Sequence, residues 1–174
     1  LIDSHNHFTL TALKMRYEID LSKVKNFEDL KKVISEFDKR NERPWILGYN
    51  LNEYNLEEKR LPTVNELDKI SSEKPILIIH SSAHYAVCNS LALEISGITK
   101  DTKDPPGGKI GRFEDGEPNG ILYEPAAINL VRRNVPEYTL EEYEEALHYT
   151  SLLYKKVGIT TVKDIGGTGK DVNE

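Results

Sequence analysis

Apolar residues recur along this chain with two periods, and each period marks a set of expected elements. Spacings of three and four residues predict helices over residues 27–40, with Asn26 as N-cap, and 139–157, which opens on a Thr-Leu-Glu-Glu capping box. Short apolar or β-branched runs predict strands over residues 1–7, 45–49, 75–80 and 159–164. The same pattern predicts a strand over 17–21, helices over 63–70, 87–95 and 124–134, and a hairpin of 109–113 with 120–123. The helix over 63–70 also opens on a capping box, Thr63-Val64-Asn65-Glu66.

The two ends of the chain and its middle predict different architectures. Residues 1–9 as a strand, and residues 135–174 as a helix followed by a strand, are typical of consecutive units of a (β/α)8 barrel. Residues 10–134 mix helices and strands and predict an inserted α+β domain. The expected fold class is therefore mixed α/β, an insertion domain flanked by parts of an incomplete TIM-like barrel. An insertion after a barrel strand emerges where active sites are built, so we expect it to wall the substrate site.

The composition and charge of the chain argue against some classes of partner and favour one cellular compartment. The formal net charge of −6 over 174 residues argues against nucleic acid or an anionic membrane. No apolar run approaches the roughly 20 residues that span a bilayer. A single cysteine, Cys88, excludes an internal disulfide and suits a reducing cytoplasm. The absence of Gln and the weight of Lys and Glu are typical of thermophile proteins. We expect a cytoplasmic protein with a small-molecule partner, and a homo-oligomer stays open.

The first candidate chemistry lies in the opening strand, which ends in His5 and His7. Side chains at positions i and i+2 of a strand face the same way, so both imidazoles can reach one divalent metal. Two surface histidines, or the remnant of a tag, are the alternative. The strand starts without an initiator Met, which indicates a piece of a longer protein.

Segments in order along the chain resemble one known family. Ile2-Asp3-Ser4-His5-Asn6-His7 resembles the opening motif of the amidohydrolase superfamily. Later segments resemble its N-substituted formamide deformylase branch, and they are residues 45–50, 61–63 with 67–68, 75–78, 82–84, 89–93, 104–108, 115–122 with Glu124, and 158–162.

The resemblance implies metal-dependent hydrolysis of an amide-like C–N bond in a distorted (β/α)8 barrel. The divalent metal, one or two ions, is expected to be zinc, although histidines also suit Fe, Mn or Ni. A catalytic zinc takes three protein ligands, and His5 and His7 supply two. Further ligands and the general base are expected beyond residue 174. The full-length protein is thus predicted to be an enzyme, and this fragment to be inactive by itself.

Four further residues are predicted to contact substrate or to support the metal ligands: His84, Asn89, Glu124 and Asp164. Each has a structural alternative, such as a helix cap for Glu124 or a turn for Asp164. The pair His80 and His84 is not predicted to bind metal separately, because a helix is not assured there. The Gly-rich run 166–170 lacks the spacing of a phosphate loop.

A second function class stays open. The incomplete metal site and the large non-barrel middle also fit a stand-alone α+β module without chemistry. Such a module would bind a ligand or partner through a surface of Trp45, Tyr49, Tyr54 and His84.

Overall fold

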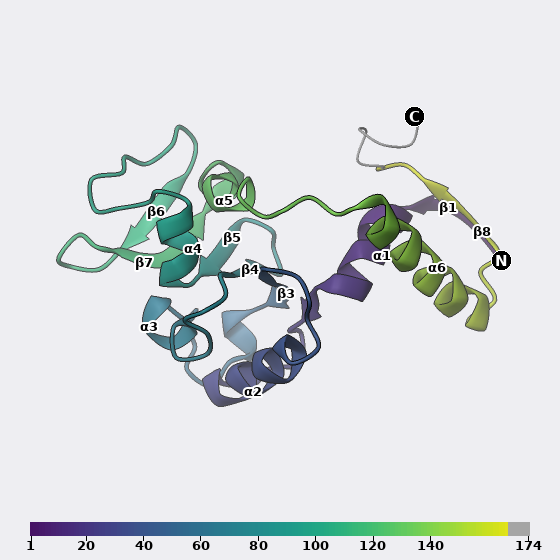
Figure 1. Cartoon of the computed structure of the whole chain (residues 1–174), viewed down its shortest axis with the longest axis horizontal. Helices are drawn as coiled ribbons and strands as arrows, with labels where there is room; N and C mark the ends of the chain where they lie inside the picture. The colour runs from purple at the N-terminus through teal and green to yellow at the C-terminus, as the bar shows by residue number, and fades with distance from the viewer. Residues whose placement is uncertain (167–174) are drawn as a thin grey trace. The chain divides into compact units, whose positions relative to one another are not determined.

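The computed structural model describes residues 1–166, which divide by their contacts into two compact units (Figure 1). Unit 1 joins residues 1–18 to those from 137 onward, and unit 2 spans residues 19–136. The domain limits expected at residues 9 and 134 stay predictions. The end of the predicted barrel segment 135–174, and the Gly-rich run after Gly166, lie outside the described residues.

Unit 1 is built on two parallel strands. Residue Ile2 of β1 pairs with Thr161 of β8, and Asn6 pairs with Asp164 after an irregularity in the register. Helix α1 follows β1 directly and was not predicted, because its apolar side chains do not gather on one face. It packs on α6 through a small buried cluster. The elements of unit 1 are β1 (Ile2–Asn6), α1 (Phe8–Tyr17), α6 (Leu140–Lys156) and β8 (Thr161–Asp164).

Unit 2 is a six-stranded mixed sheet in the order β2-β3-β4-β5-β7-β6. The first three strands of that order are parallel, and the remaining neighbours are antiparallel. The strands are β2 (Ile19–Asp20), β3 (Ile46–Leu51), β4 (Ile76–His80), β5 (Tyr85–Cys88), β6 (Lys109–Arg112) and β7 (Pro118–Tyr123).

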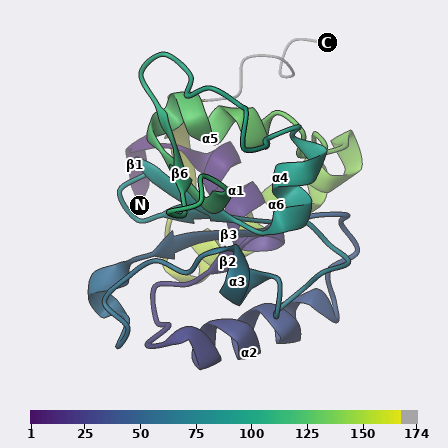
Figure 2. The ribbon, with the colours of Figure 1, turned by 90° about the vertical axis from the view of Figure 1, so that its left-hand side faces the viewer.

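Helices cover both faces of this sheet, with α2 on one side and α4 and α5 on the other (Figure 2). Strand alternation explains the two cores, since Ile76 and Ile78 pack with Leu30 of α2 while Leu77 packs with Ala127 of α5. The helices of unit 2 are α2 (Phe27–Asp38), the 3₁₀ turn η1 (Glu53–Asn55), α3 (Val64–Leu67), α4 (Ser90–Ile95) and α5 (Glu124–Arg132).

The mixed α/β class is confirmed, as are both capping boxes and the 109–123 hairpin. The helix expected over residues 87–95 is wrong in its first part. Cys88 ends strand β5, where it pairs with Leu77, and α4 begins only after Asn89. A short apolar run fits either a strand or a buried helix, and pairing with β4 and β7 decides for the strand. The strand expected over 17–21 shrinks to two residues, because Tyr17 ends α1.

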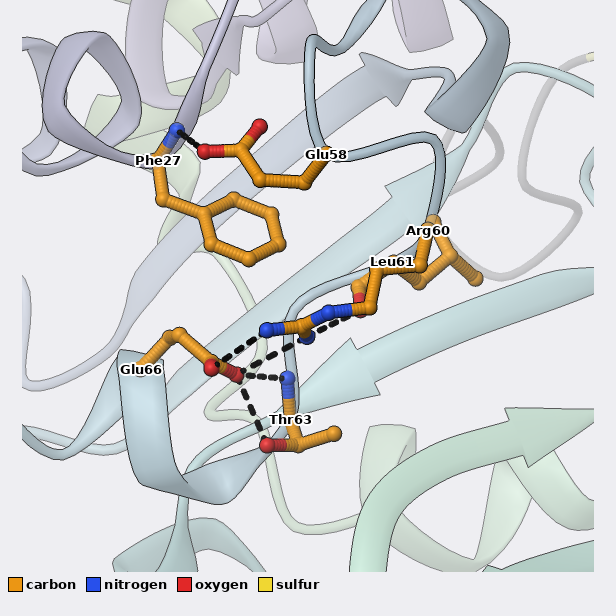
Figure 3. A network of polar contacts seen from close by, with 6 residues as sticks. All are labelled: Phe27, Glu58, Arg60, Leu61, Thr63 and Glu66. Carbon is orange, nitrogen blue, oxygen red and sulfur yellow. Dashed lines mark hydrogen bonds and ion pairs between the residues drawn. The ribbon is translucent and has the colours of Figure 1, made fainter.

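A polar network fixes the loop between β3 and α3 (Figure 3). Glu58 accepts the N–H of Phe27 at the start of α2, and the guanidinium of Arg60 stacks 4.6 Å from the Phe27 ring centroid. Arg60 also pairs with Glu66, which accepts hydrogen bonds from the N–H and hydroxyl of Thr63. These donors, Arg60 first, lower the pKa of Glu66 to about 2. The loop is thus tied to both neighbouring helices.

Among the described residues, no helix is long and apolar enough to cross a membrane.

Candidate functional site

The histidine pair lies at the exposed end of β1. The strand ends at Asn6, and His7 is the N-cap of α1 with φ −109° and ψ 58°. Simple strand alternation therefore does not extend to His7. The two imidazoles nonetheless lie close together, with ring centroids 5.8 Å apart and ring planes at 80°.

Asp164 performs the capping that His7 does not. The N–H and the hydroxyl of Thr9 both donate to Asp164 Oδ2 at 2.8 Å, and the N–H of Gly166 donates to Oδ1 at 3.1 Å. The side chain of His7 forms no capping hydrogen bond. These donors, the Thr9 N–H first, lower the pKa of Asp164. A carboxylate of β8 thus satisfies the first turn of α1 and leaves the His7 ring available.

The backbone of His5 is held from the other side. Its N–H donates to Asp3 Oδ1 at 3.2 Å, and the amide of Asn6 donates to Asp3 Oδ2 at 2.7 Å. The same amide lies 3.3 Å from the hydroxyl of Tyr154 in α6, whose ring packs edge-on against Phe8. The hydrogen bond from Asn6, followed by that from His5, lowers the pKa of Asp3. Hydrogen bonds to Asp3 and Asp164 therefore hold the backbone at and next to both histidines.

Gly166 packs closely against the imidazole of His7 and limits where this ring can lie. A Cβ atom on Gly166 would lie 2.3 Å from His7 Nδ1, so only glycine leaves room for the imidazole there. With metal–nitrogen bonds of about 2.0–2.1 Å, two imidazoles on one tetrahedral metal have centroids roughly 5 Å apart. The observed 5.8 Å is near that value. Residues 1–166 contain no group of three or more potential ligands, so the pair fits part of a metal site.

A second polar locus lies in unit 2, where β5 begins and β7 ends. His84 Nδ1 and Glu124 Oε2 are 2.7 Å apart, and the backbone N–H of Glu124 donates to the carbonyl of His84, also at 2.7 Å. The register that pairs Tyr85 with Tyr123 brings these residues together. Both side chains stay about half exposed or more, 61% for His84 and 48% for Glu124. The locus can therefore meet a ligand.

Asn89, which was predicted to contact substrate, lies inside unit 2 and forms hydrogen bonds within the fold. It is fully buried, and its Oδ1 accepts from the N–H groups of Ile76 and Ala92. Its amide donates to the carbonyls of Ser71 and Lys74. Because both polar atoms of the side chain are engaged, we leave Asn89 out of the proposed site.

His80 was not predicted as a site residue, yet it lies beside this locus. Its Nδ1 accepts from the N–H of Ser82 at 3.0 Å, and its Nε2 lies 2.8 Å from Glu53 Oε2. The position of His80 at the end of an apolar strand was the one feature of the sequence that could have indicated a site residue.

The surface expected for a stand-alone binding module is not present as predicted. Trp45 is 4% exposed and belongs to the core between the sheet and α5. Tyr54, by contrast, is 77% exposed. Tyr54 and His84 of that predicted surface are exposed, whereas Trp45 is not.

A model of the amidohydrolase family matches residues 1–174. The chain belongs to the amidohydrolase family, which confirms the resemblance inferred from the sequence.

Two curated relatives cover nearly the whole chain. It is 37% identical to protein LONG AFTER FAR-RED 3 of Arabidopsis thaliana, over 95% of this chain and 28% of that protein. It is 34% identical to the N-substituted formamide deformylase of Arthrobacter pascens, over 97% of this chain and 32% of that protein. The chain thus spans about a third of the length of these relatives.

A solved structure has a similar fold. It is an uncharacterized metal-dependent hydrolase from Pyrococcus horikoshii, with a TM-score of 0.64 and 24% identity. The match covers 92% of this chain and 29% of that one.

Proposed function

We propose that this chain is part of a metal-dependent hydrolase of amide-like C–N bonds, with His5 and His7 as two ligands of a divalent metal, zinc. The observation that supports this most is the exposed pair of imidazoles 5.8 Å apart on a braced backbone, within a chain of the amidohydrolase family. The name of the Arthrobacter relative supports the bond type. The substrate is a small molecule.

A bound zinc ion would lower the pKa of a coordinated water towards ~7 and polarise the scissile carbonyl. The chain's own residues keep the ligands in place, since Asp164 holds the backbone after His7 and Asp3 holds that of His5. His84 and Glu124 contact the substrate in this proposal. The third ligand and the general base come from outside the chain, so the chain alone is inactive.

We further propose that β1 and β8 are neighbouring strands of a (β/α)8 barrel and that unit 2 is an insertion between them. Parallel pairing of β1 with β8, with α6 directly before β8, supports this arrangement.

The activity test uses a longer polypeptide that contains this chain. Its metal content and its hydrolysis of a panel of formamides and amides are compared with those of a variant carrying His5→Ala and His7→Ala. We expect bound metal and hydrolysis in the parent and loss of both in the variant. Equal hydrolysis in the two proteins would refute the assignment. His148→Ala, at an exposed position on α6, is the matched control.

A further inference from the structure

One edge of the unit 2 sheet gathers the carboxyl ends of β2, β3, β4 and β7 and the start of β5. The registers align this edge, since Leu51 pairs with His80 and Tyr85 pairs with Tyr123. Hydrogen bonds link neighbouring strand ends, for example from the amide of Asn50 to Asp20. The edge is therefore a continuous row of polar groups from several strands.

Three residues of this edge have a left-handed backbone: Asn50 at φ 63°, Ala83 at φ 61° and Glu124 at φ 68°. Asparagine adopts this region readily, whereas alanine and glutamate do so at a steric cost that glycine would avoid. Such conformations persist where the surroundings enforce them, and they concentrate at ligand sites. At position 124, the side chain therefore has a use, a favourable contact that compensates for the steric cost of this backbone conformation.

That use is the contact with His84. Since a carboxylate only accepts hydrogen bonds, the 2.7 Å contact between His84 Nδ1 and Glu124 Oε2 places a proton on Nδ1. In a neutral imidazole the other nitrogen, Nε2, is then an acceptor. The N–H of His84 donates to Ser82 Oγ at 3.2 Å, and its carbonyl accepts from Glu124, so the residue is held by its backbone as well. Glu124 thus fixes the tautomer of an exposed ring.

Aromatic rings lie along the same edge. Tyr85 packs edge-on between His80 and Tyr123, with centroids 5.3 Å and 5.5 Å away. Tyr54 is exposed on η1, beside Glu53, whose carboxylate reaches His80. Hydrogen-bond acceptors with aromatic surroundings suit a ligand that carries an N–H donor and an apolar body.

We propose that His84 recognises the amide N–H of the substrate through Nε2 and that Glu124 is the positioning residue that sets this tautomer. The proposal rests on the proposed function and specifies it, because it selects amides that carry an N–H over fully N-substituted amides.

The tautomer is tested by nitrogen NMR of the histidine rings in the 174-residue chain. We expect Nδ1 of His84 to carry the proton near neutral pH in the parent chain. In Glu124→Gly, which suits the backbone conformation but removes the carboxylate, the ring is expected to shift towards the Nε2–H form. A parent His84 that carries its proton on Nε2 would overturn the proposal.

Recognition is tested with two probes, formanilide, which carries the amide N–H, and N-methylformanilide, which lacks it. Loss of one hydrogen bond predicts that formanilide binds the parent chain about 3- to 10-fold more tightly. That preference should vanish in His84→Ala and Glu124→Gly, while unchanged backbone amide spectra away from the edge show that both variants fold. An equal affinity of the parent for both probes, or a preference that survives His84→Ala, would overturn the proposal.

A failure of the proposed metal-dependent function can be distinguished from a failure of the proposed N–H recognition by His84. A chain with His5→Ala and His7→Ala should lose metal binding yet keep the His84 tautomer and the formanilide preference. If the longer polypeptide binds no metal while the chain keeps the His84 tautomer and the formanilide preference, the proposed function fails and the N–H recognition stands.

Discussion

Asp164 accepts hydrogen bonds from both the N–H and the hydroxyl of Thr9, and through them strand β8 caps helix α1, whose N-cap residue is His7. The capping carboxylate usually belongs to the N-cap residue itself. Here the N-cap residue is a histidine, and because Asp164 caps the helix, the His7 imidazole makes no capping hydrogen bond, as the proposed metal binding requires.

Asp164→Ala should therefore weaken both the helix and the metal site. We expect a loss of about 1 kcal/mol in the free energy of unfolding, from the missing cap. Because residues that orient ligands matter nearly as much as the ligands, Zn²⁺ affinity should fall by roughly 10- to 100-fold. Calorimetry measures the affinity and urea unfolding the stability. Lys163→Ala, one position earlier in β8, should change neither, and an unaltered affinity in Asp164→Ala would contradict the role given to the cap.

Gly166→Ala tests the position of the His7 ring. A methyl group at this position would lie 2.3 Å from Nδ1, so the imidazole has to turn away. A side chain moves more cheaply than backbone, and we expect little change in thermal stability but a clear loss of Zn²⁺ affinity. Ser4→Ala, an exposed change in β1, is the control. If Gly166→Ala binds Zn²⁺ as the parent does, His7 is not a ligand in the conformation described.

The free energy of unfolding should fall at low pH, because Glu66 loses its stabilising charge when it is protonated. The pKa of Glu66 is lowered to about 2 in the folded state, from an ordinary value of 4.5. Its contribution is thus fully present above pH 4.5 and is lost as the pH falls towards 2.

Glu66→Gln should reduce the free energy of unfolding at pH 7 by roughly 1.5–3 kcal/mol, the range for hydrogen bonds to charged groups. The difference between variant and parent should shrink when urea unfolding is repeated at pH 2 to 3. Glu28→Gln, an exposed change in α2, should show no such trend. A variant deficit that stays constant over this range would mean that the carboxylate charge contributes nothing.

Cys88 should be chemically inert while the chain is folded. It is fully buried, and burial, aided by the charge of Asp68, raises the pKa of its thiol. A thiol reagent such as dithionitrobenzoate should react only after unfolding in urea. Rapid reaction of the native chain would show that β5 is accessible.

The strain at Glu124 predicts a difference between two truncations. Both Glu124→Ala and Glu124→Gly lose the contact with His84, but only glycine adopts φ 68° without steric cost. Glu124→Gly should be more stable than Glu124→Ala by about 1–2 kcal/mol in thermal or urea unfolding. Equal stabilities would mean that the backbone relaxes without cost and that no strain is held there.

Periodicity and capping signals predicted most of the helices and strands, because these signals are local. The capping boxes at Thr63 and Thr139 lie where expected, and the apolar stripe of α2 packs on the sheet. Helix α1 escaped prediction because its burial depends on α6, more than a hundred residues later. The strand at Cys88 was misjudged for a similar reason, since its neighbours β4 and β7 decide its conformation.

The candidate site was predictable in its residue types but not in its geometry. His84 and Glu124 were both singled out from the sequence, yet their contact spans 40 positions and depends on the register of β5 with β7. The left-handed backbone of Glu124 leaves no trace in the sequence, because glutamate is not typical of that region. Asn89 shows the converse, since a polar residue that suits a ligand site is used wholly for a buried cap.

The first measurement to make on metal binding by His5 and His7 is a Zn²⁺ titration of the 174-residue chain, followed by nitrogen NMR of the histidine rings. We expect Zn²⁺ to shift the ring signals of His5 and His7 first, with little effect on those of His84 and His148. The His5→Ala and His7→Ala variant should show no such saturable shift. Equal shifts at all the histidines, or shifts confined to His84 and His148, would contradict metal binding by this pair.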